Sequence, residues 1–259
     1  ILLILLFTFV KVFYTLLRLK KEQYMLKTLS SMKDEHLNIV TYGPSGSGKT
    51  FLISTLPGKK LIVSFETGGT KSLQGKENID VYDCTVDGNN NELARERRID
   101  KLRHFITQVL PTIIGNYQWL CIDSLTELSQ LIVESLEKKY PDKSNTFVLW
   151  GEYNKGLRAI LKDFRDVRIN TYMTCLDSID KDDSGKRFIS FDINGKISNR
   201  IPALFDEIFY LKEFDENNKP VRKLITGNYH NIIAKDRSGK LALIENANLS
   251  EILTKIQGE

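Results

Sequence analysis

The segment GPSGSGKT, residues 43–50, constrains the fold more than any other part of the chain. Its spacing matches GxxxxGK[ST] completely, with the apolar run 38–42 before it and a helical pattern after it. Glycines at these positions let successive backbone N–H groups turn inward around phosphate oxygens, and the N-terminus of the following helix adds a partial positive charge. The segment therefore predicts a phosphate-binding loop made of Gly43, Pro44, Ser45, Gly46, Ser47, Gly48, Lys49 and Thr50.

Two side chains of this loop and one acid further along the chain predict that the bound ligand is Mg·ATP. Lys49 is expected to reach the β- and γ-phosphates, and the Thr50 hydroxyl is expected to bind Mg²⁺. The metal needs a second protein contact, and Asp123 closes the apolar run 119–123 at the point where a strand would end. The alternative for an aspartate in this position is a cap on the helix that follows.

Strand-length apolar runs alternate with helical patterns along most of the chain. The candidate strands are 38–42, 60–65, 79–84, 119–123 and 168–176, and the candidate helices are 92–114, 124–140 and 153–164. This alternation predicts an α/β fold with a mostly parallel central sheet and helices on both faces. Beyond it, we expect 178–188 to be a polar loop and 207–214 and 221–226 to be hairpin strands that extend the sheet.

Composition and charge exclude several classes of protein. The three cysteines are far apart and form no CxxC pair, which argues against a zinc site or a disulfide framework and favours a reducing cytoplasm. The formal charge is +4, but residues 1–24 hold four basic residues and one acidic residue, so the rest of the chain has 33 basic and 32 acidic residues. Any contact with nucleic acid must therefore come from local patches of charge.

Residues 1–31 are predicted to be an extension, mostly apolar over its first 24 residues, ahead of one domain over 32–259. Its uninterrupted apolar run has ten residues, short of the ~20 that a spanning helix needs. Its charges follow that run, whereas a signal peptide places them before it. Upstream sequence read in frame, with the natural start at Met25 or Met32, is favoured over a membrane anchor.

The residue after Asp123 helps to distinguish classes of ATPase. Many hydrolytic phosphate-loop enzymes carry a glutamate there to polarise the attacking water, but this chain has Ser124. Glu66 ends the candidate strand 60–65 instead, and a sheet that places this strand beside that of Asp123 would direct Glu66 at the γ-phosphate. A carboxylate there can orient water for in-line attack. A solvated glutamate at a strand end is the alternative.

These features together resemble the RecA-like ATPase core. More narrowly, residues 36–245 resemble phage nucleotide-binding proteins of an AAA-domain family, through the segments WGEYNKGLRAIL, NGKISNRIPALFDEIFYL and AKDRSGKL. Some of those proteins are RecA-like single-strand annealing proteins. The resemblance implies an oligomeric ATPase that acts on single-stranded DNA in phage recombination or replication, in the host cytoplasm. An ATP-dependent regulatory or packaging module that acts on a protein partner is the alternative.

The resemblance also implies roles for individual residues. Lys235 and Arg237 align with basic residues that contact nucleotide, in some relatives across a subunit interface, and a cation there could stabilise the transition state. A solvated turn is the alternative. Where related proteins carry a polar sensor of the γ-phosphate, this chain has Leu176, with Thr174 as a substitute nearby.

Two segments are expected to contact DNA if the chain binds it. The first, 137–145, is basic and aromatic through Lys138, Lys139, Tyr140 and Lys143, a combination suited to phosphate contact and base stacking. The second, 178–187, carries acids and bases in nearly equal number. Both are also typical of plain solvated loops. A small-molecule kinase lacks support because no arginine-rich lid is apparent.

Overall fold

The computed structural model describes residues 36–142, 146–181, 184–195, 197 and 200–258. The predicted extension over 1–31, with both of its interpretations, lies outside these residues. None of the helices in the described ranges is long and apolar enough to cross a membrane.

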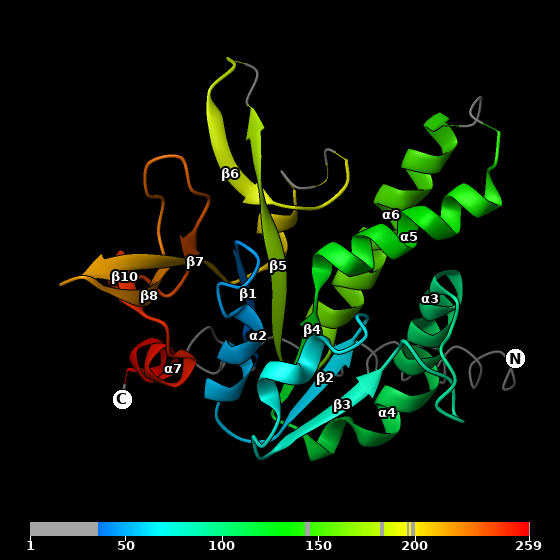
Figure 1. The fold of residues 1–259 in the computed structure, drawn as a ribbon, viewed down its shortest axis with the longest axis horizontal. Helices are drawn as coiled ribbons and strands as arrows, with labels where there is room; N and C mark the ends of the chain where they lie inside the picture. The colour runs from blue at the N-terminus through cyan, green and yellow to red at the C-terminus, as the bar shows by residue number, and fades with distance from the viewer. Residues whose placement is uncertain (1–35, 143–145, 182–183, 196, 198–199, 259) are drawn as a thin grey trace, which may run out of the picture. The chain divides into compact units, whose positions relative to one another are not determined.

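A mixed sheet of ten strands forms the centre of the described domain (Figure 1). Its order is β10-β8-β7-β1-β5-β4-β2-β3, with β6 paired to β5 and β9 paired to β7. The strands are β1 (Asn38–Gly43), β2 (Lys60–Ser64), β3 (Ile79–Asp83), β4 (Trp119–Asp123), β5 (Asn170–Lys181), β6 (Arg187–Phe191), β7 (Glu207–Glu216), β8 (Lys219–Ile225), β9 (Lys235–Asp236) and β10 (Ile244–Asn246).

The core of this sheet is parallel from β3 through β2, β4, β5 and β1 to β7, and the remaining pairs are antiparallel. The predicted α/β fold with a mostly parallel sheet and added hairpin strands is therefore confirmed. Since parallel strands share one direction, the residues that follow β1, β2 and β4 gather at one edge of the sheet, beside the middle of β5.

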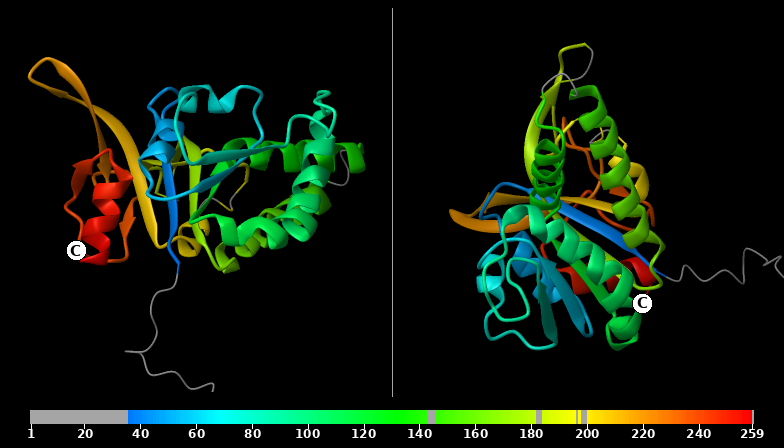
Figure 2. Two further views of the ribbon diagram at one scale, coloured as in Figure 1. Left: turned by 90° about the horizontal axis from the view of Figure 1, so that it is seen from below. Right: turned by 90° about the vertical axis from the view of Figure 1, so that its right-hand side faces the viewer.

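Helices cover both faces of the sheet, as Figure 2 shows from two further sides. They are α2 (Lys49–Leu52), α3 (Arg95–His104), α4 (Leu110–Ile113), α5 (Leu125–Lys139), α6 (Thr146–Asp166) and α7 (Leu249–Gln257). Alternate residues of β1 belong to different cores: Val40 packs with the apolar residues of α3, α5 and α6, and Ile39 with those of α2 and α7. Side chains alternate across a strand, so one buried strand supplies both cores.

Local signals explain where the longer helices begin and which face they bury. Ser124 caps α5, because its hydroxyl accepts a hydrogen bond from the Glu127 N–H at 3.3 Å. In α6 the buried residues Leu149, Tyr153, Leu157, Leu161 and Phe164 recur every three or four positions. The described part of α6 extends beyond the predicted range 153–164 at both ends.

The prediction of a polar loop over 178–188 is wrong. β5 continues to Lys181 and pairs antiparallel with β6, so this segment is mostly a hairpin that extends beyond the main sheet (Figure 1). Backbone hydrogen bonds hold the two strands together whatever the polarity of their side chains, and the side chain of Ile179 is 70% exposed. Charged residues on both faces concealed this strand from a reading based on hydrophobic pattern.

Candidate functional site

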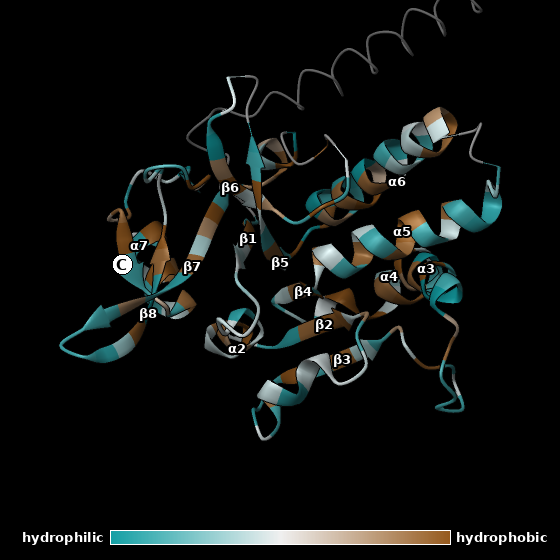
Figure 3. Ribbon diagram, turned by 45° about the horizontal axis from the view of Figure 1, so that its top comes forward, coloured by the Kyte–Doolittle hydropathy of each residue, from teal (hydrophilic) through white to brown (hydrophobic). Residues whose placement is uncertain are grey.

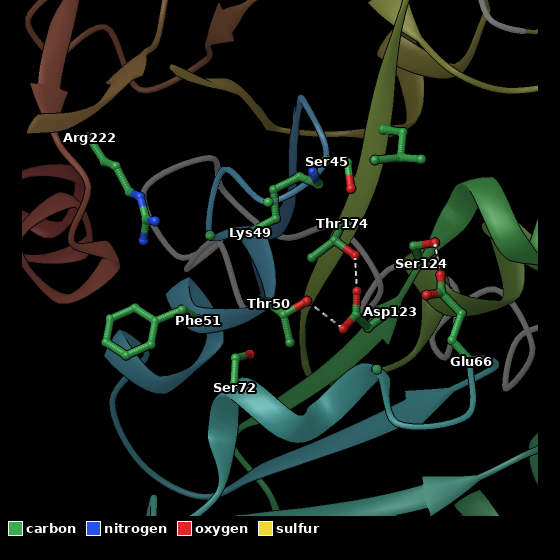
Figure 4. A pocket seen from close by; sticks show the side chains of 14 residues that line it. Ser45, Lys49, Thr50, Phe51, Glu66, Ser72, Asp123, Ser124, Thr174 and Arg222 are labelled. Atoms are coloured by element: carbon green, nitrogen blue, oxygen red, sulfur yellow. Dashed lines mark hydrogen bonds between the residues drawn. The ribbon is translucent and has the colours of Figure 1, made fainter. Parts of the chain in front are cut away.

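A cavity of about 420 Å³ opens at the carboxyl ends of β1, β2 and β4, beside Thr174 and Leu176 within β5 (Figure 4). Its position follows from the parallel core, which brings the carboxyl ends of these strands together. The residues that line it are Ser45, Gly46, Gly48, Lys49, Thr50, Phe51, Glu66, Gly69, Ser72, Asp123, Ser124, Thr174, Leu176 and Arg222.

The loop between β1 and α2 depends on its glycines for two separate reasons. Gly46 and Gly48 have φ of 75° and 100°, a region that glycine adopts without steric cost. At Gly43 the constraint is space, because a Cβ atom would lie 2.5 Å from the backbone oxygen of Leu211 in β7. The loop conformation therefore depends on the neighbouring strand as well as on its own sequence.

Lys49 is buried at the centre of this loop. Its Nζ donates hydrogen bonds to the backbone oxygens of Gly43 at 2.8 Å and of Pro44 at 2.7 Å. Burial lowers the pKa of Lys49, and nearby acidic groups, Asp177 first, act in the opposite sense. Of the predicted loop residues, Gly43, Pro44 and Ser47 do not line the cavity. Gly43 and Pro44 hold the lysine by their carbonyls, and Pro44 also accepts a hydrogen bond from the Ser47 N–H.

Thr50 and Asp123 meet across the cavity, although they are far apart in sequence. The Thr50 hydroxyl donates to Asp123 Oδ2 at 2.9 Å, and Thr174 donates to Asp123 Oδ1. Burial raises the pKa of Asp123, while these two hydrogen bonds act to lower it. A buried carboxylate beside a hydroxyl is a donor set that suits Mg²⁺.

This pair would supply only part of a magnesium coordination shell. Among the described residues there is no group of three or more His, Cys, Asp or Glu side chains that could hold a metal ion. Mg²⁺ commonly takes one or two protein oxygens and completes its shell with substrate phosphates and water. Thr50 and Asp123 fit that pattern, and Ser124 rather than Asp123 caps the following helix.

Glu66 reaches the cavity as the sequence predicts. β2 lies beside β4, with Ser64 in register with Asp123, and Glu66 follows two residues later. The Ser124 hydroxyl donates to Glu66 Oε1 at 3.2 Å, which orients an otherwise exposed carboxylate (Figure 4). Many other ATPases carry a glutamate at the position of Ser124. In this chain the Ser124 hydroxyl instead contacts the carboxylate of Glu66, which follows the neighbouring strand β2.

The position expected for a γ-phosphate sensor is apolar. Leu176 lines the cavity, whereas the nearby Asp177 accepts a hydrogen bond from the Tyr210 hydroxyl at 3.0 Å and is absent from the lining. Thr174 also lines the cavity, but its hydroxyl is bonded to Asp123.

Lys235 and Arg237 lie away from this cavity. β9 pairs with the first residues of β7, which lie beside the start of β1, whereas the phosphate loop follows the end of β1. Lys235 Nζ donates to the Phe205 oxygen at 2.6 Å, and Arg237 forms an ion pair with Asp206 at 2.6 Å. Within a single chain these cations do not line the site, so a contact with nucleotide would have to involve the cavity of another copy.

Four residues that line the cavity were not predicted from the sequence: Phe51, Gly69, Ser72 and Arg222. Arg222 in β8 extends its guanidinium to the loop, and a Cβ atom on Gly48 would lie 2.7 Å from its Nη1. In the part of the chain that the structure describes, Arg222 makes no hydrogen bond or ion pair. Phe51 directly follows Thr50, and its side chain is 41% exposed. Phe51 could have been inferred from the motif, but the position of Arg222 depends on the β7–β8 hairpin.

The basic residues predicted to meet DNA at the end of α5 are already paired. Lys138 forms an ion pair with Glu96, and Lys139 with Glu152 at 3.0 Å. The Tyr140 hydroxyl also donates to Glu152, at 2.7 Å. Lys143, the remaining cation of this prediction, lies outside the described residues.

The comparison with family models identifies one family. A family model described as "AAA domain" matches residues 35–238. Among solved structures, the chain is similar to a KaiC-like protein of the hyperthermophilic archaeon Pyrococcus horikoshii, with 14% identity and a TM-score of 0.39, over 78% of this chain and 82% of that one. A search of curated proteins found no match.

Proposed function

The chain belongs to the AAA domain family, and on that premise we propose that it binds Mg·ATP beside the phosphate loop and hydrolyses it. The observation that carries the proposal is the meeting of Lys49, Thr50, Asp123 and Glu66 in one cavity. A phosphate loop alone accounts for nucleotide binding. The carboxylate of Glu66, oriented by Ser124, is what supports hydrolysis.

Binding begins with the charges of the loop and of Lys49. Backbone N–H groups of the loop and the start of α2 attract the β- and γ-phosphates. Lys49 exchanges its contacts with the two backbone carbonyls for phosphate oxygens, a stronger partner because both groups are charged. Mg²⁺, when bound, would neutralise charge on the phosphates. Thr50 and Asp123 would hold it, and Thr174 would keep the Asp123 carboxylate in place.

Hydrolysis depends on the position of one water molecule. Glu66 Oε1 accepts the hydrogen bond from Ser124, which leaves Oε2 to accept a proton from water. The water oxygen then attacks the γ-phosphorus, the bond to the bridging oxygen of ADP breaks, and inorganic phosphate leaves. Preorganisation of this carboxylate contributes to catalysis because it need not reorient during the reaction.

Arg222 and Phe51 extend the site beyond the four residues predicted from motifs. The Arg222 guanidinium lies next to Gly48 without a partner among the described groups, so it is available to contact a phosphate oxygen. Phe51 presents an aromatic ring to the same cavity and is suited to stack on the base. Arg222 would therefore contact the phosphates, and Phe51 would contact the base.

The proposal also covers DNA and the assembly of several copies of the chain. On the resemblance to phage RecA-like proteins, we propose that ATP turnover serves a reaction on single-stranded DNA during recombination or replication. We also propose that the chain works as an oligomer, in which Lys235 and Arg237 reach the cavity of a neighbouring copy. Because these two residues lie away from the cavity of their own chain, a role in catalysis requires a second chain.

The decisive experiment compares ATP turnover with and without single-stranded DNA, using the full chain and its Glu66→Gln variant. Wild type should release phosphate faster when DNA is present. The variant should bind ATP with unchanged affinity but lose turnover, because glutamine cannot accept the proton. Turnover equal to wild type in Glu66→Gln would remove the assigned role, and turnover indifferent to DNA would remove the DNA part.

One observation favours a second function, in which ATP controls contact with a protein partner. Phe147 is 95% exposed, Val148 is 49% exposed and Trp150 is 36% exposed, all at the start of α6. Clustered apolar side chains on a surface are typical of protein contacts. In that case Phe147→Ser should abolish ATP-dependent assembly in sedimentation measurements and leave oligonucleotide binding unchanged. Unaltered assembly by the variant would exclude this surface.

A further inference from the structure

A second cleft, separate from the nucleotide cavity, combines positive charge with an apolar floor. It has a volume of about 260 Å³ and lies between α6 and η8 (Ile201–Leu204), the short 3₁₀ helix before β7. Arg158, Lys162 and Arg200 surround it, and Ile197, Ile201 and Leu204 contribute apolar surface. No acidic residue is among those that line it.

Within the described residues, the three cations of this cleft have no acidic partner. Arg158 is half-buried, whereas Lys162 and Arg200 are exposed. None of the three side chains forms a hydrogen bond or ion pair with another described residue, in contrast to the paired lysines after α5. Three unpaired cations close together repel one another, so an anion that binds among them gains their combined attraction.

The charge continues along α6 beyond the cleft. Lys155, Arg158, Lys162 and Arg165 follow one another at intervals of three, four and three residues, which places them on one face of the helix. Arg165, at the end of this row, forms an ion pair with Asp166 at 2.7 Å. Figure 3 shows hydrophilic segments alternating with hydrophobic ones along α6. The row runs over eleven residues, a rise of ~15 Å along the helix. One strand of nucleic acid carries a phosphate every ~3.4 Å in a duplex, so a row of this length can face several phosphates.

We propose that the cleft between α6 and η8 binds the phosphodiester backbone of single-stranded DNA through Arg158, Lys162 and Arg200. A row of charge favours a polyanion over a single phosphate ion, and the apolar floor offers a surface to sugar or base. This inference rests on the DNA part of the proposed function. It moves the expected contact from the segments 137–145 and 178–187 to the surface of α6.

The test is the salt dependence of binding by the full chain to a fluorescent oligothymidylate, measured by anisotropy. Each cation that neutralises a phosphate contributes about −0.7 to the slope of log K against log salt for single strands. Arg158→Gln, Lys162→Gln and Arg200→Gln should each make the slope less steep by about 0.7, and the triple variant by about 2. Lys219→Gln, an exposed lysine at the β7–β8 turn, is the charge-matched control and should leave the slope unchanged.

Two further measurements keep the outcomes separable. ATP turnover without DNA and the unfolding curve should match wild type in all three single variants, since these residues do not line the nucleotide cavity. A triple variant that binds the oligonucleotide with the wild-type slope would overturn the cleft and leave the proposed ATPase standing. An equal decrease of the salt-dependence slope in Lys219→Gln would also overturn the cleft as the binding site, because the decrease would then reflect net charge alone.

The chemistry of the partner is tested by competition. Polyglutamate at equal charge should displace the oligonucleotide poorly if phosphates and sugar are recognised. Displacement as strong as that by unlabelled oligonucleotide would assign the cleft to an acidic protein and overturn the proposal. Failure of wild type to bind the oligonucleotide at any salt concentration would overturn both this inference and the DNA role, while turnover without DNA would still test the ATPase.

Discussion

Glu207 gives a prediction of pH-dependent stability whose size can be worked from the structure. Its side chain is 1% exposed, at the start of β7, in register with Asp236 of β9. Oε1 accepts a hydrogen bond from the Ser238 N–H at 3.3 Å, while Oε2 has no hydrogen-bond partner among the described residues. Burial, and then repulsion from Asp236, raises the pKa of Glu207 to about 8.

Asp236 is the member of the pair that keeps its charge. Burial acts to raise its pKa, but hydrogen bonds from Ser238, Leu241 and Gly239 outweigh that effect and lower it. Glu207 therefore holds its proton in the folded chain at pH values where it is ionised in the unfolded chain. The free energy of unfolding is expected to be unaffected by this group below pH 4.5 and to fall as the pH rises from there to about 8.

The expected loss is large enough to measure. A pKa raised from 4.5 to about 8 corresponds to about 5 kcal/mol above the folded pKa, and about 3 kcal/mol of it is already lost at pH 7. Glu207→Gln removes the titration but retains an oxygen to accept from Ser238. The variant should therefore be more stable than wild type at pH 7 by about 3 kcal/mol and equal to it, within ~1 kcal/mol, at pH 4.

Urea unfolding at a series of pH values from 4 to 9 measures this difference. The difference in unfolding free energy between Glu207→Gln and wild type should grow with pH and level off above pH 8. Asp206→Asn, at the neighbouring acid that pairs with Arg237, is a control that should not produce this trend. Parallel curves for Glu207→Gln and wild type across the whole range would refute the reasoning, because the carboxylate would then titrate alike in both states.

Three further predictions concern the nucleotide cavity. Asp123→Asn should be at least as stable as wild type at pH 7 without ligand, because it removes a buried charge. Its melting temperature should no longer rise when Mg²⁺ is added in the presence of ATP, and a retained rise would contradict the metal role. Arg222→Gln should lower kcat/KM for ATP by on the order of 100-fold with a stability change within ~0.5 kcal/mol, and kinetics equal to wild type would rule out a phosphate contact. Phe51→Ala should weaken ATP binding by about 1–3 kcal/mol in calorimetry but leave tripolyphosphate unaffected, whereas equal weakening of both would place the ring away from the base.

Much of the site could be predicted because its parts follow local rules. The phosphate loop has a fixed spacing, and Asp123 and Glu66 each follow a buried strand. In a parallel sheet such residues come together at one edge, so their meeting required only that β2 lie beside β4. Apolar runs of strand length identified the core strands, because both faces of these strands are buried. This signal failed at the end of β5, where backbone pairing with β6 holds a segment whose side chains are largely polar.

The sequence by itself predicted a phosphate-binding loop and the acids that can lie beside it. Only the tertiary structure decided that β7 and β8 lie next to the loop, which puts Leu211 against Gly43 and Arg222 against Gly48. It also placed Lys235 and Arg237 away from the nucleotide cavity of their own chain. Arg158 of α6 and Arg200, just before η8, came to line the same cleft. The physical reason is that the order and register of strands, and the packing of helices on them, depend on contacts between residues distant in sequence. A motif indicates the chemistry that one segment can perform, whereas the residues that contact that segment depend on the packing of the whole domain.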